Sequence, residues 1–192
     1  MILAALGNPG KKYAHTRHNI AWRLVERLSF FGELSWEFRF NADFVRYQPG
    51  GGAGPVYILL PLTYMNLSGR SVNALMRFYK LDLSELLVIH DDIEMEFGVF
   101  GFKQGGGLGG HNGLRSVAAS LGTRDFGRMR LGVSRPPDGD VSAYVLSDFH
   151  PEEAVVLPSI LDAAAARLEA GLETPIPELA SRHAKCLAGP DD

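Results

Sequence analysis

The sequence predicts an α/β fold, a single three-layer domain over residues 1–192 in which a central twisted sheet, mixed but mostly parallel, is flanked by helices. Short apolar runs of strand length alternate along the chain with longer segments whose apolar residues recur at a helical period. Clusters of glycine and proline separate these segments, as they do at turns. A chain of 192 residues is long enough to bury a substantial core within one domain.

Three all-apolar strands and two helices are predicted in the N-terminal half. Ile2–Leu6, Val56–Leu60 and Leu86–Ile89 are almost wholly apolar, which is typical of strands buried on both faces. A helix is expected from Asn19 to about Phe31, because its apolar residues fall on one face. We expect Ser68 to cap a second helix.

The segments between these elements are predicted to lie near the surface. Trp36–Phe40 alternates aromatic and polar residues, as a half-buried strand does, and Gly50–Gly54 forms a turn after it. Glu94–Lys103 also alternates, and we expect an exposed excursion that turns at Gly98. Hairpin-like pieces of this kind make the predicted sheet mixed.

The C-terminal half continues the alternation of helices and strands. A helix from about Gly113 to Leu121 precedes a strand, Phe126–Val133, and a loop, Ser134–Gly139. Pro151 is expected to begin a helix that runs to about Ala170, because proline is tolerated in the first turn. The tail from Glu173 has weaker periodicity and is expected to form short helical pieces.

The composition excludes several classes of protein. Contents of 46% hydrophobic and 21% charged residues are ordinary for a soluble globular protein. No apolar stretch approaches the ~20 residues of a membrane span, and the first apolar run is too short for a signal peptide. The single Cys186 excludes an internal disulfide and agrees with a reducing cytoplasm, where we expect the protein. The six histidines are scattered, without the spacing typical of a zinc site.

The net charge of −3 is distributed unevenly along the chain. Residues 1–80 carry a net charge of +6, and residues 81–102 carry −6. Residues 103–135 carry +5, and residues 136–192 carry −8. A local basic patch can therefore bind phosphate on an acidic protein, although ordinary solvated surface explains the same pattern.

Polar residues suited to chemistry follow the predicted strands. Gly7-Asn8-Pro9-Gly10 forms a tight turn after the first strand, and His18 lies beyond it where a helix begins. Asn66, Asp91 and Asn112 recur at further strand ends. Because ligands bind at the carboxyl ends of strands in open α/β sheets, we expect these side chains to share one rim.

Each of these residues also has a structural explanation. His18 can be a loop histidine and Asp91 can cap a turn, while Asn66 and Asn112 can cap helices. The combination favours hydrolysis, because an imidazole is a base near neutral pH, a carboxylate orients it, and neutral amides donate hydrogen bonds to a carbonyl oxygen. Without a Gly-x-Ser-x-Gly signature, attack by water is favoured over an acyl-enzyme. His90 is expected to pack or to form hydrogen bonds.

The glycine-rich loop Gly105–Gly110 raises the alternative of a nucleotide enzyme, because such loops expose backbone N–H groups to phosphate. The loop comes late instead of after the first strand, and no Gly-Lys-Ser/Thr of a P-loop exists. We therefore interpret it as a loop that needs close backbone approach and that delivers Asn112 to the rim.

Six groups of residues form a longer pattern, in order along the chain. They are Gly7-Asn8-Pro9-Gly10 with Tyr13, Thr16-Arg17-His18-Asn19, Pro61-Leu62-Thr63-Tyr64-Met65-Asn66-Leu67-Ser68-Gly69, His90-Asp91-Asp92, Gly109-Gly110-His111-Asn112-Gly113-Leu114 and Arg128-Met129-Arg130-Leu131-Gly132. Together these motifs resemble the bacterial-type peptidyl-tRNA hydrolases, and the resemblance extends to about residue 149. Residues 151–192 match no motif and are expected to form a C-terminal helical tail.

The resemblance implies a monomeric esterase, without metal or cofactor, that cleaves the ester between a peptide and the 3′-terminal ribose of tRNA. It implies that His18 is the base and that Asp91 orients it. The residues implied to bind the peptide are Asn8, Tyr13, Met65, Asn66 and Asn112. Lys103 and Arg130 resemble the pair that clamps the phosphate at the tRNA 5′ end. The implied partner is peptidyl-tRNA, bound through its acceptor stem and 3′ end, and no membrane is involved.

Two features depart from the pattern of that family. Ala5 stands where the family usually has glycine in the first strand, which is a change in packing. Glu94 and Glu96 make the segment before Lys103 less basic, which bears on the strength of acceptor-stem binding. The alternative function is a non-catalytic RNA-binding relative of the same fold, and retention of the base with its carboxylate counts against it.

Overall fold

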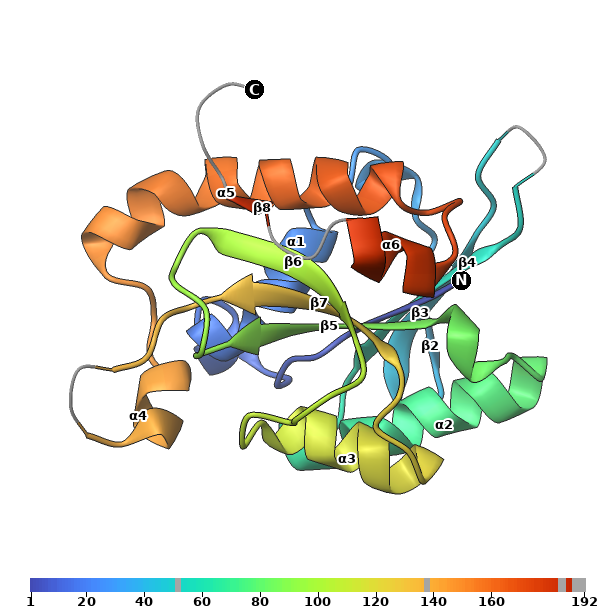
Figure 1. The fold of residues 1–192 in the computed structure, drawn as a ribbon, viewed down its shortest axis with the longest axis horizontal. Coiled ribbons are helices and arrows are strands. Elements are labelled where there is room, and N and C mark those ends of the chain that lie inside the picture. Colours follow the sequence, from blue (N-terminus) through green and yellow to red (C-terminus); the bar gives the residue numbers. More distant parts are fainter. Residues whose placement is uncertain (51–52, 137–138, 183–185, 188–192) are drawn as a thin grey trace.

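Strands and helices alternate along the computed structural model (Figure 1), which describes residues 1–50, 53–136, 139–182 and 186–187. The strands are β1 (Ile2–Ala5), β2 (Glu37–Arg39), β3 (Ala42–Tyr47), β4 (Val56–Pro61), β5 (Leu86–Asp92), β6 (Val99–Gln104), β7 (Gly127–Gly132) and β8 (Cys186–Leu187). The α-helices are α1 (Ile20–Val25), α2 (Ser68–Tyr79), α3 (Asn112–Leu121), α4 (Val141–Val145), α5 (Pro151–Ala170) and α6 (Ile176–Arg182). The short 3-10 helices are η1 (Lys11–Tyr13), η2 (Arg17–Asn19), η3 (Phe31–Glu33), η4 (Met65–Leu67) and η5 (Leu83–Glu85).

The described strands form one eight-stranded sheet in the order β2-β3-β4-β1-β5-β7-β6-β8. Its centre, β4-β1-β5-β7, is parallel, because β1 pairs with β4 and β5, and β5 pairs with β7. The strands on both sides of this centre pair antiparallel. The predicted mixed sheet flanked by helices is therefore confirmed, with the parallel pairing concentrated in its centre.

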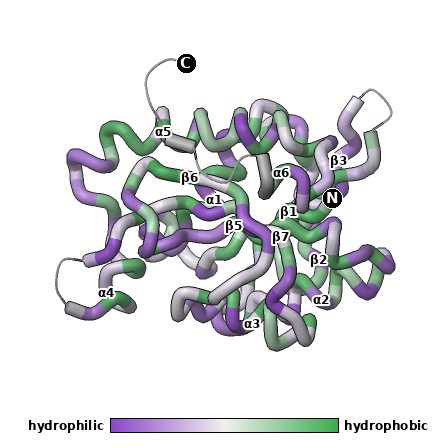
Figure 2. The backbone as a smooth tube through the Cα atoms, in the orientation of Figure 1, coloured by the Kyte–Doolittle hydropathy of each residue, from purple (hydrophilic) through white to green (hydrophobic). Residues whose placement is uncertain are grey.

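Helices cover both faces of the sheet and complete three layers (Figure 1). α2 and α3 lie on one face, and α1, α5 and α6 lie on the other. One apolar core joins Leu3 and Ile89 to the α1–α5 side, and a second joins Ile2 and Val88 to the α2–α3 side. Successive strand residues point to opposite faces, so β1 and β5 contribute to both cores. Figure 2 shows α2 and α3 as alternately hydrophobic and hydrophilic, as helices with one buried face are.

Two details of the predicted helices are wrong. α1 ends at Val25, well before the predicted end, because its last turn tightens and Phe30 leaves the helix to stack on Tyr47 with ring centroids 4.1 Å apart. Ser68 is the first residue of α2 and does not cap it. Its hydroxyl instead donates to the backbone carbonyl of Met65, at 3.0 Å.

The predicted strand over residues 36–40 is present as β2, with Trp36 and Phe40 half-buried as expected and Phe38 exposed. β2 is the edge strand of the sheet, and the side chain of Phe38 is 71% exposed. Its partner β3, which the sequence pattern did not predict, carries the buried Phe44. Phe40 and Asn41 join the two strands with φ angles of 58° and 53°. Two successive residues of positive φ match the right-handed twist of a tight hairpin.

The segment expected as an exposed excursion, Glu94–Lys103, contains the buried strand β6. The turn at Gly98 is present, with a φ of 87°. Beyond it, β6 pairs with β7 and β8, and Phe100 and Phe102 are buried in the core that also contains residues of α5 and α6. The exposed reading of this segment is therefore wrong.

The C-terminal region agrees with prediction for its long helix. α5 runs from Pro151 to Ala170, and His150 with Glu153 forms a capping box at its start. The tail contains α6, and its strand β8 was not predicted. Residues 51–52 of the predicted turn, 137–138 of the predicted loop, and 183–185 and 188–192 of the tail lie outside the described residues. Within the described ranges, no helix has both the length and the apolar character needed to cross a membrane.

Candidate active site

A cleft of about 890 Å³ opens beside the carboxyl ends of β1 and β5. The two strands run parallel, so the loops that follow them leave the sheet at the same edge. Every residue with a predicted site role lines this cleft, namely Asn8, Tyr13, His18, Met65, Asn66, Asp91, Lys103, Asn112 and Arg130. The structure therefore brings together all the residues that the sequence singled out.

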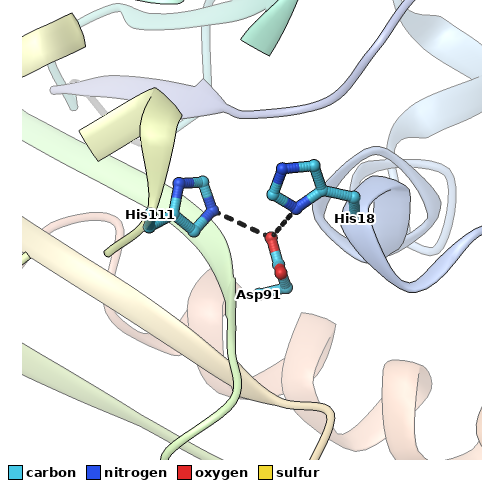
Figure 3. A group of neighbouring side chains, drawn as sticks. All are labelled: His18, Asp91 and His111. Carbon is cyan, nitrogen blue, oxygen red and sulfur yellow. Dashed lines mark hydrogen bonds and ion pairs between the residues drawn. The ribbon is translucent and has the colours of Figure 1, made fainter. Parts of the chain in front are cut away.

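Two histidines in the cleft share one carboxylate oxygen (Figure 3). Nδ1 of His18 lies 2.8 Å from Oδ1 of Asp91, and Nε2 of His111 lies 2.9 Å from the same oxygen. Asp91 is near the end of β5, His18 lies in η2, and His111 directly precedes α3. Because Asp91 is only 2% exposed, water competes little for this oxygen.

The contacts of His111 determine where the protons lie. Its Nδ1 accepts hydrogen bonds from the backbone N–H groups of Gly113 and Leu114, at 3.1 and 3.3 Å, and so carries no proton. Its proton lies on Nε2, which donates to Asp91. An ionised carboxylate only accepts, so Nδ1 of His18 also donates to Asp91. Nε2 of His18 is thereby left with a lone pair and forms no hydrogen bond with the described residues.

His111 carries no predicted role in the sequence, although it lies in one of the motifs. Its signal is its place between Gly109-Gly110 and the start of α3, where a side chain can accept from the first free backbone N–H groups of the helix. Both glycines have positive φ, 55° and 75°, which bends the loop sharply before the helix.

Burial and hydrogen bonding act in opposite directions on this group. Burial raises the pKa of Asp91, but the interactions with His18 and His111 outweigh it and hold that pKa well below its usual range. Burial lowers the pKa of His18, but the negative charge and hydrogen bond of Asp91 raise it by more, so the pKa of His18 is raised. Asp91 therefore remains ionised while His18 can take up a proton.

His90 belongs to the wall of the cleft and not to this hydrogen-bonded group. Its Nδ1 donates to the backbone carbonyl of Asp91 at 2.6 Å, and its ring meets that of His111 edge to face at 5.2 Å. Burial and the neighbouring His111 lower the pKa of His90 to about 3, so it stays neutral. The packing and hydrogen-bonding role expected for it is confirmed.

Asn8 fixes the turn after β1 against two other segments. Its backbone N–H and C=O pair with the side-chain amide of Asn19, both at 2.9 Å. Its own side-chain oxygen accepts from the backbone N–H of Met65, also at 2.9 Å. The side-chain NH₂ of Asn8 finds no hydrogen-bond partner among the described residues, and Asn8 lines the cleft. Asn8 therefore holds the turn after β1 in place, and its side-chain NH₂ group remains available as a hydrogen-bond donor.

Asn66 and Asn112 are both exposed and line the cleft. Asn66 lies in η4, and Asn112 is the first residue of α3. The cap positions belong to Leu67 at α2 and to His111 at α3. The alternative that these two asparagines cap helices is therefore wrong, and neither side chain forms a hydrogen bond with the described residues.

Lys103 and Arg130 lie on one face of neighbouring antiparallel strands. Arg130 is opposite Gly101 and Lys103 is opposite Arg128, so these side chains project from the same side of the sheet. Nε of Arg130 donates to Asp92 at 2.6 Å. The buried Arg128 holds the glycine loop by donating to the carbonyls of Gly106 and Gly107. Hydrogen bonds therefore hold Arg128 and Arg130 in fixed positions at this cationic edge of the cleft.

His18, Asp91 and His111 are also the one group, among the described residues, that brings metal-ligating atoms within 4.8 Å of one another. Two imidazoles and a carboxylate are a donor set that zinc accepts. The two nitrogens that face the carboxylate both carry protons, however, and a metal ion would have to replace both. The hydrogen bonds within this group already pair the two protonated nitrogens with the carboxylate, without a metal ion.

An imidazole held by a buried carboxylate, in a cleft at the carboxyl edge of an α/β sheet, is the arrangement of enzymes that use a general base. The family model for peptidyl-tRNA hydrolase matches residues 2–187. The chain therefore belongs to the peptidyl-tRNA hydrolase family.

Individual relatives agree with this assignment. The chain is 47% identical over 162 residues to the peptidyl-tRNA hydrolase of Treponema pallidum, covering 83% of this chain and 80% of that protein. It is 43% identical over 180 residues to that of Geobacter sp. (strain M21), covering 94% and 95%. The crystal structure of a peptidyl-tRNA hydrolase in complex with N-propanol superposes with a TM-score of 0.84 at 33% identity, covering 94% of this chain and 92% of that one. The crystal structure of the Acinetobacter baumannii enzyme gives 0.81 at 33% identity, covering 94% and 90%.

We predict that Asp91→Asn lowers the pKa of His18. In the wild type the carboxylate raises this pKa above ~6.5, the ordinary value for histidine, and without the charge burial is no longer opposed. The stabilisation from protonated His18 beside Asp91 is therefore present below pH ~6.5 and lost as the pH rises through the raised pKa. NMR titration of the imidazole measures both values, with His18→Ala to assign the signal. An equal or higher pKa in Asp91→Asn would contradict this.

Proposed function

We propose that this chain hydrolyses the ester between a peptide, or an N-blocked amino acid, and the 3′-terminal ribose of tRNA. The observation that carries the proposal is the hydrogen bond from Nδ1 of His18 to the ionised Asp91, which leaves a basic Nε2 in the cleft. Membership of the peptidyl-tRNA hydrolase family supports the substrate.

In the proposed reaction Nε2 of His18 removes a proton from water while the water oxygen bonds to the ester carbonyl carbon. Asp91 stabilises the imidazolium that forms and keeps the ring oriented. When the ester C–O bond breaks, the proton passes from His18 to the departing ribose oxygen. The products are a peptide carboxylic acid, which releases its remaining proton to solvent and becomes a carboxylate, and tRNA with a free terminal hydroxyl, and His18 is neutral again.

The proposed peptide site is formed by amides and apolar surface. Asn66 and Asn112 donate to the carbonyl oxygen or to the peptide backbone, because neutral amides stabilise developing negative charge without adding a base. Asn8 offers its NH₂ group, and Tyr13 and Met65 supply contact surface along the cleft.

The proposed tRNA site lies at the cationic edge. Lys103 and Arg130 bind the phosphate at the tRNA 5′ end, while the 3′ end of the acceptor stem reaches His18. Nε of Arg130 is bonded to Asp92, so its terminal nitrogens are the ones proposed to meet phosphate.

We further propose that the chain acts as a single domain, residues 1–192, and as a monomer, without metal or cofactor. All the groups assigned to catalysis and binding come from one chain and line one cleft. A cytoplasmic location follows from the proposed substrate, which is a product of ribosomes.

Replacing His18 by alanine should lower kcat by roughly two to four orders of magnitude, the range for loss of a general base, with binding nearly unchanged. Asp91→Asn should cost less, because the imidazole still acts from a poorer orientation. The assay is hydrolysis of an N-acetylated aminoacyl-tRNA. Activity of His18→Ala within about threefold of wild type would remove the assignment. Tight tRNA binding by a wild type that hydrolyses nothing would favour the non-catalytic RNA-binding relative.

Asn66→Ala and Asn112→Ala should each lower kcat by about two to three orders of magnitude with little change in melting temperature. Each amide is exposed to the cleft and neither caps a helix, so its removal affects the reaction more than the fold. Kinetics and thermal melting of the same preparations separate the two effects. Variants that lose about 1 kcal/mol of stability, as lost caps do, but keep kcat/KM would count against this role.

Lys103→Ala or Arg130→Ala should raise KM for full-length substrate and reduce the salt dependence of binding by about one phosphate contact. The chemical step should change little, because neither side chain is placed at the ester. A minimal substrate without a 5′ phosphate should be hydrolysed equally by wild type and variants. Arg46→Ala, at an exposed cation of β3 outside the cleft, is the matched control. Equal losses on both substrates would instead indicate a role in folding or catalysis.

A further inference from the structure

Arg17 is a cation with no solvent exposure, and it directly precedes His18 in η2. It is among the largest fully buried side chains of the described residues. Burying a guanidinium is costly unless it is paired and hydrogen-bonded, so its partners show what the fold gains from it. The function proposed above assigns it nothing.

All the polar partners of the Arg17 side chain among the described residues lie in one segment, residues 147–153, which follows α4 and includes the first turn of α5. Nη1 donates to the carbonyl of Asp148 and, at 3.3 Å, to the hydroxyl of Ser147. Nη2 forms an ion pair with Glu153 in the first turn of α5.

Two aromatic rings pack against the same guanidinium. Its Cζ lies 4.3 Å from the ring centroid of Tyr144 and 5.0 Å from that of Phe149. Lysine cannot reproduce this combination of two hydrogen-bonding arms and a flat stacking surface.

The three residues of η2 are anchored in three directions. Arg17 binds segment 147–153, His18 binds Asp91, and Asn19 binds the backbone of Asn8. The backbone follows the same course, because the N–H of Arg17 donates to the carbonyl of Ser147 at 3.0 Å. The position of His18 is therefore defined from both sides along the chain.

The segment that Arg17 holds is continuous with one wall of the cleft. Val141, Val145 and Leu146, in and just after α4, line the cleft. Tyr144, which stacks on Arg17, donates from its hydroxyl to the carbonyl of Val133 at 2.7 Å. Arg17 thus connects the turn that carries His18 to the adjacent wall formed at α4.

We propose that Arg17 is a positioning residue, which holds η2 against the α4–α5 segment so that His18 keeps Nδ1 on Asp91 and Nε2 in the cleft. This inference rests on the proposed role of His18 as base. Arg17 touches neither water nor ester, and its effect on the reaction passes through the placement of the imidazole and of the α4 wall.

The test compares Arg17→Met/Glu153→Gln with Arg17→Lys and with a control. The double variant removes both charges of the buried pair, which avoids leaving one of them unpaired, and glutamine keeps an oxygen for the capping box. Arg17→Lys is the second variant if the first fails to fold. Arg27→Met is the matched control, because Arg27 also joins the N-terminal region to α5, through an exposed ion pair with Asp162, and lies outside the cleft.

Two measurements are made well below the melting temperature of each protein: kcat on N-acetylated aminoacyl-tRNA, and the downfield proton signal of His18 Nδ1 in the free protein. If the double variant folds, its kcat should fall roughly ten- to a hundredfold, because small misplacements of reacting groups lower the rate to this extent. Its Nδ1 proton signal should broaden or disappear, and Arg17→Lys should fall between it and the wild type. Arg27→Met should match the wild type in both measurements.

A double variant or Arg17→Lys variant with wild-type kcat and an unchanged Nδ1 signal would overturn the proposal and leave Arg17 with a role in stability alone. If the wild type itself does not hydrolyse the substrate, the proposed function fails. The Nδ1 signal still tests the positioning in that case, because it requires no turnover.

Discussion

The cleft depends on one buried carboxylate that remains ionised. Burial alone would raise the pKa of Asp91, and the charge interactions and hydrogen bonds with His18 and His111 hold that pKa low. The ionised group accepts from both rings, so it fixes them relative to each other. Because His111 also caps α3, the start of that helix and its exposed Asn112 are placed relative to the same oxygen. The charge of Asp91 therefore orders the ring of His18, the start of α3 and the neighbouring Asn112 together.

The place of this carboxylate follows from the parallel pairing of β1 with β5. The N–H of Leu6 donates to the carbonyl of Ile89 at 2.9 Å, so the loops after the two strands begin side by side. The irregular turn after β1 can be buried there because the Asn19 amide satisfies both backbone groups of Asn8. Buried backbone groups without partners cost free energy, so side-chain amides replace the pairing that a regular strand would supply.

The centre of the sheet and the pairing of the base with its carboxylate could be predicted, because both rest on apolar runs that end in polar residues. β6 could not, because Phe100 and Phe102 alternate with smaller or polar residues as in an exposed strand, and the core that buries them includes the distant helices α5 and α6. The roles of His111 and Arg17 depend on partners 20 and 136 positions away in the chain. No local pattern distinguishes a buried arginine from an exposed one, and the place of His111 before α3 indicates a helix cap but not its hydrogen bond to Asp91.

Of the two acidic residues that make this sequence less basic near the cleft, Glu94 is paired locally, and so is the neighbouring Asp92. Glu94 forms an ion pair with Arg135, and Asp92 forms one with Arg130. Such pairing weakens the long-range field that steers a polyanion toward the surface, but it holds the guanidinium of Arg130 in place before a phosphate arrives. Lys103, at the same edge, is exposed and forms no ion pair with the described residues. In the proposed complex, recognition of the terminal phosphate therefore rests more on preorganised short-range hydrogen bonds than on attraction at a distance.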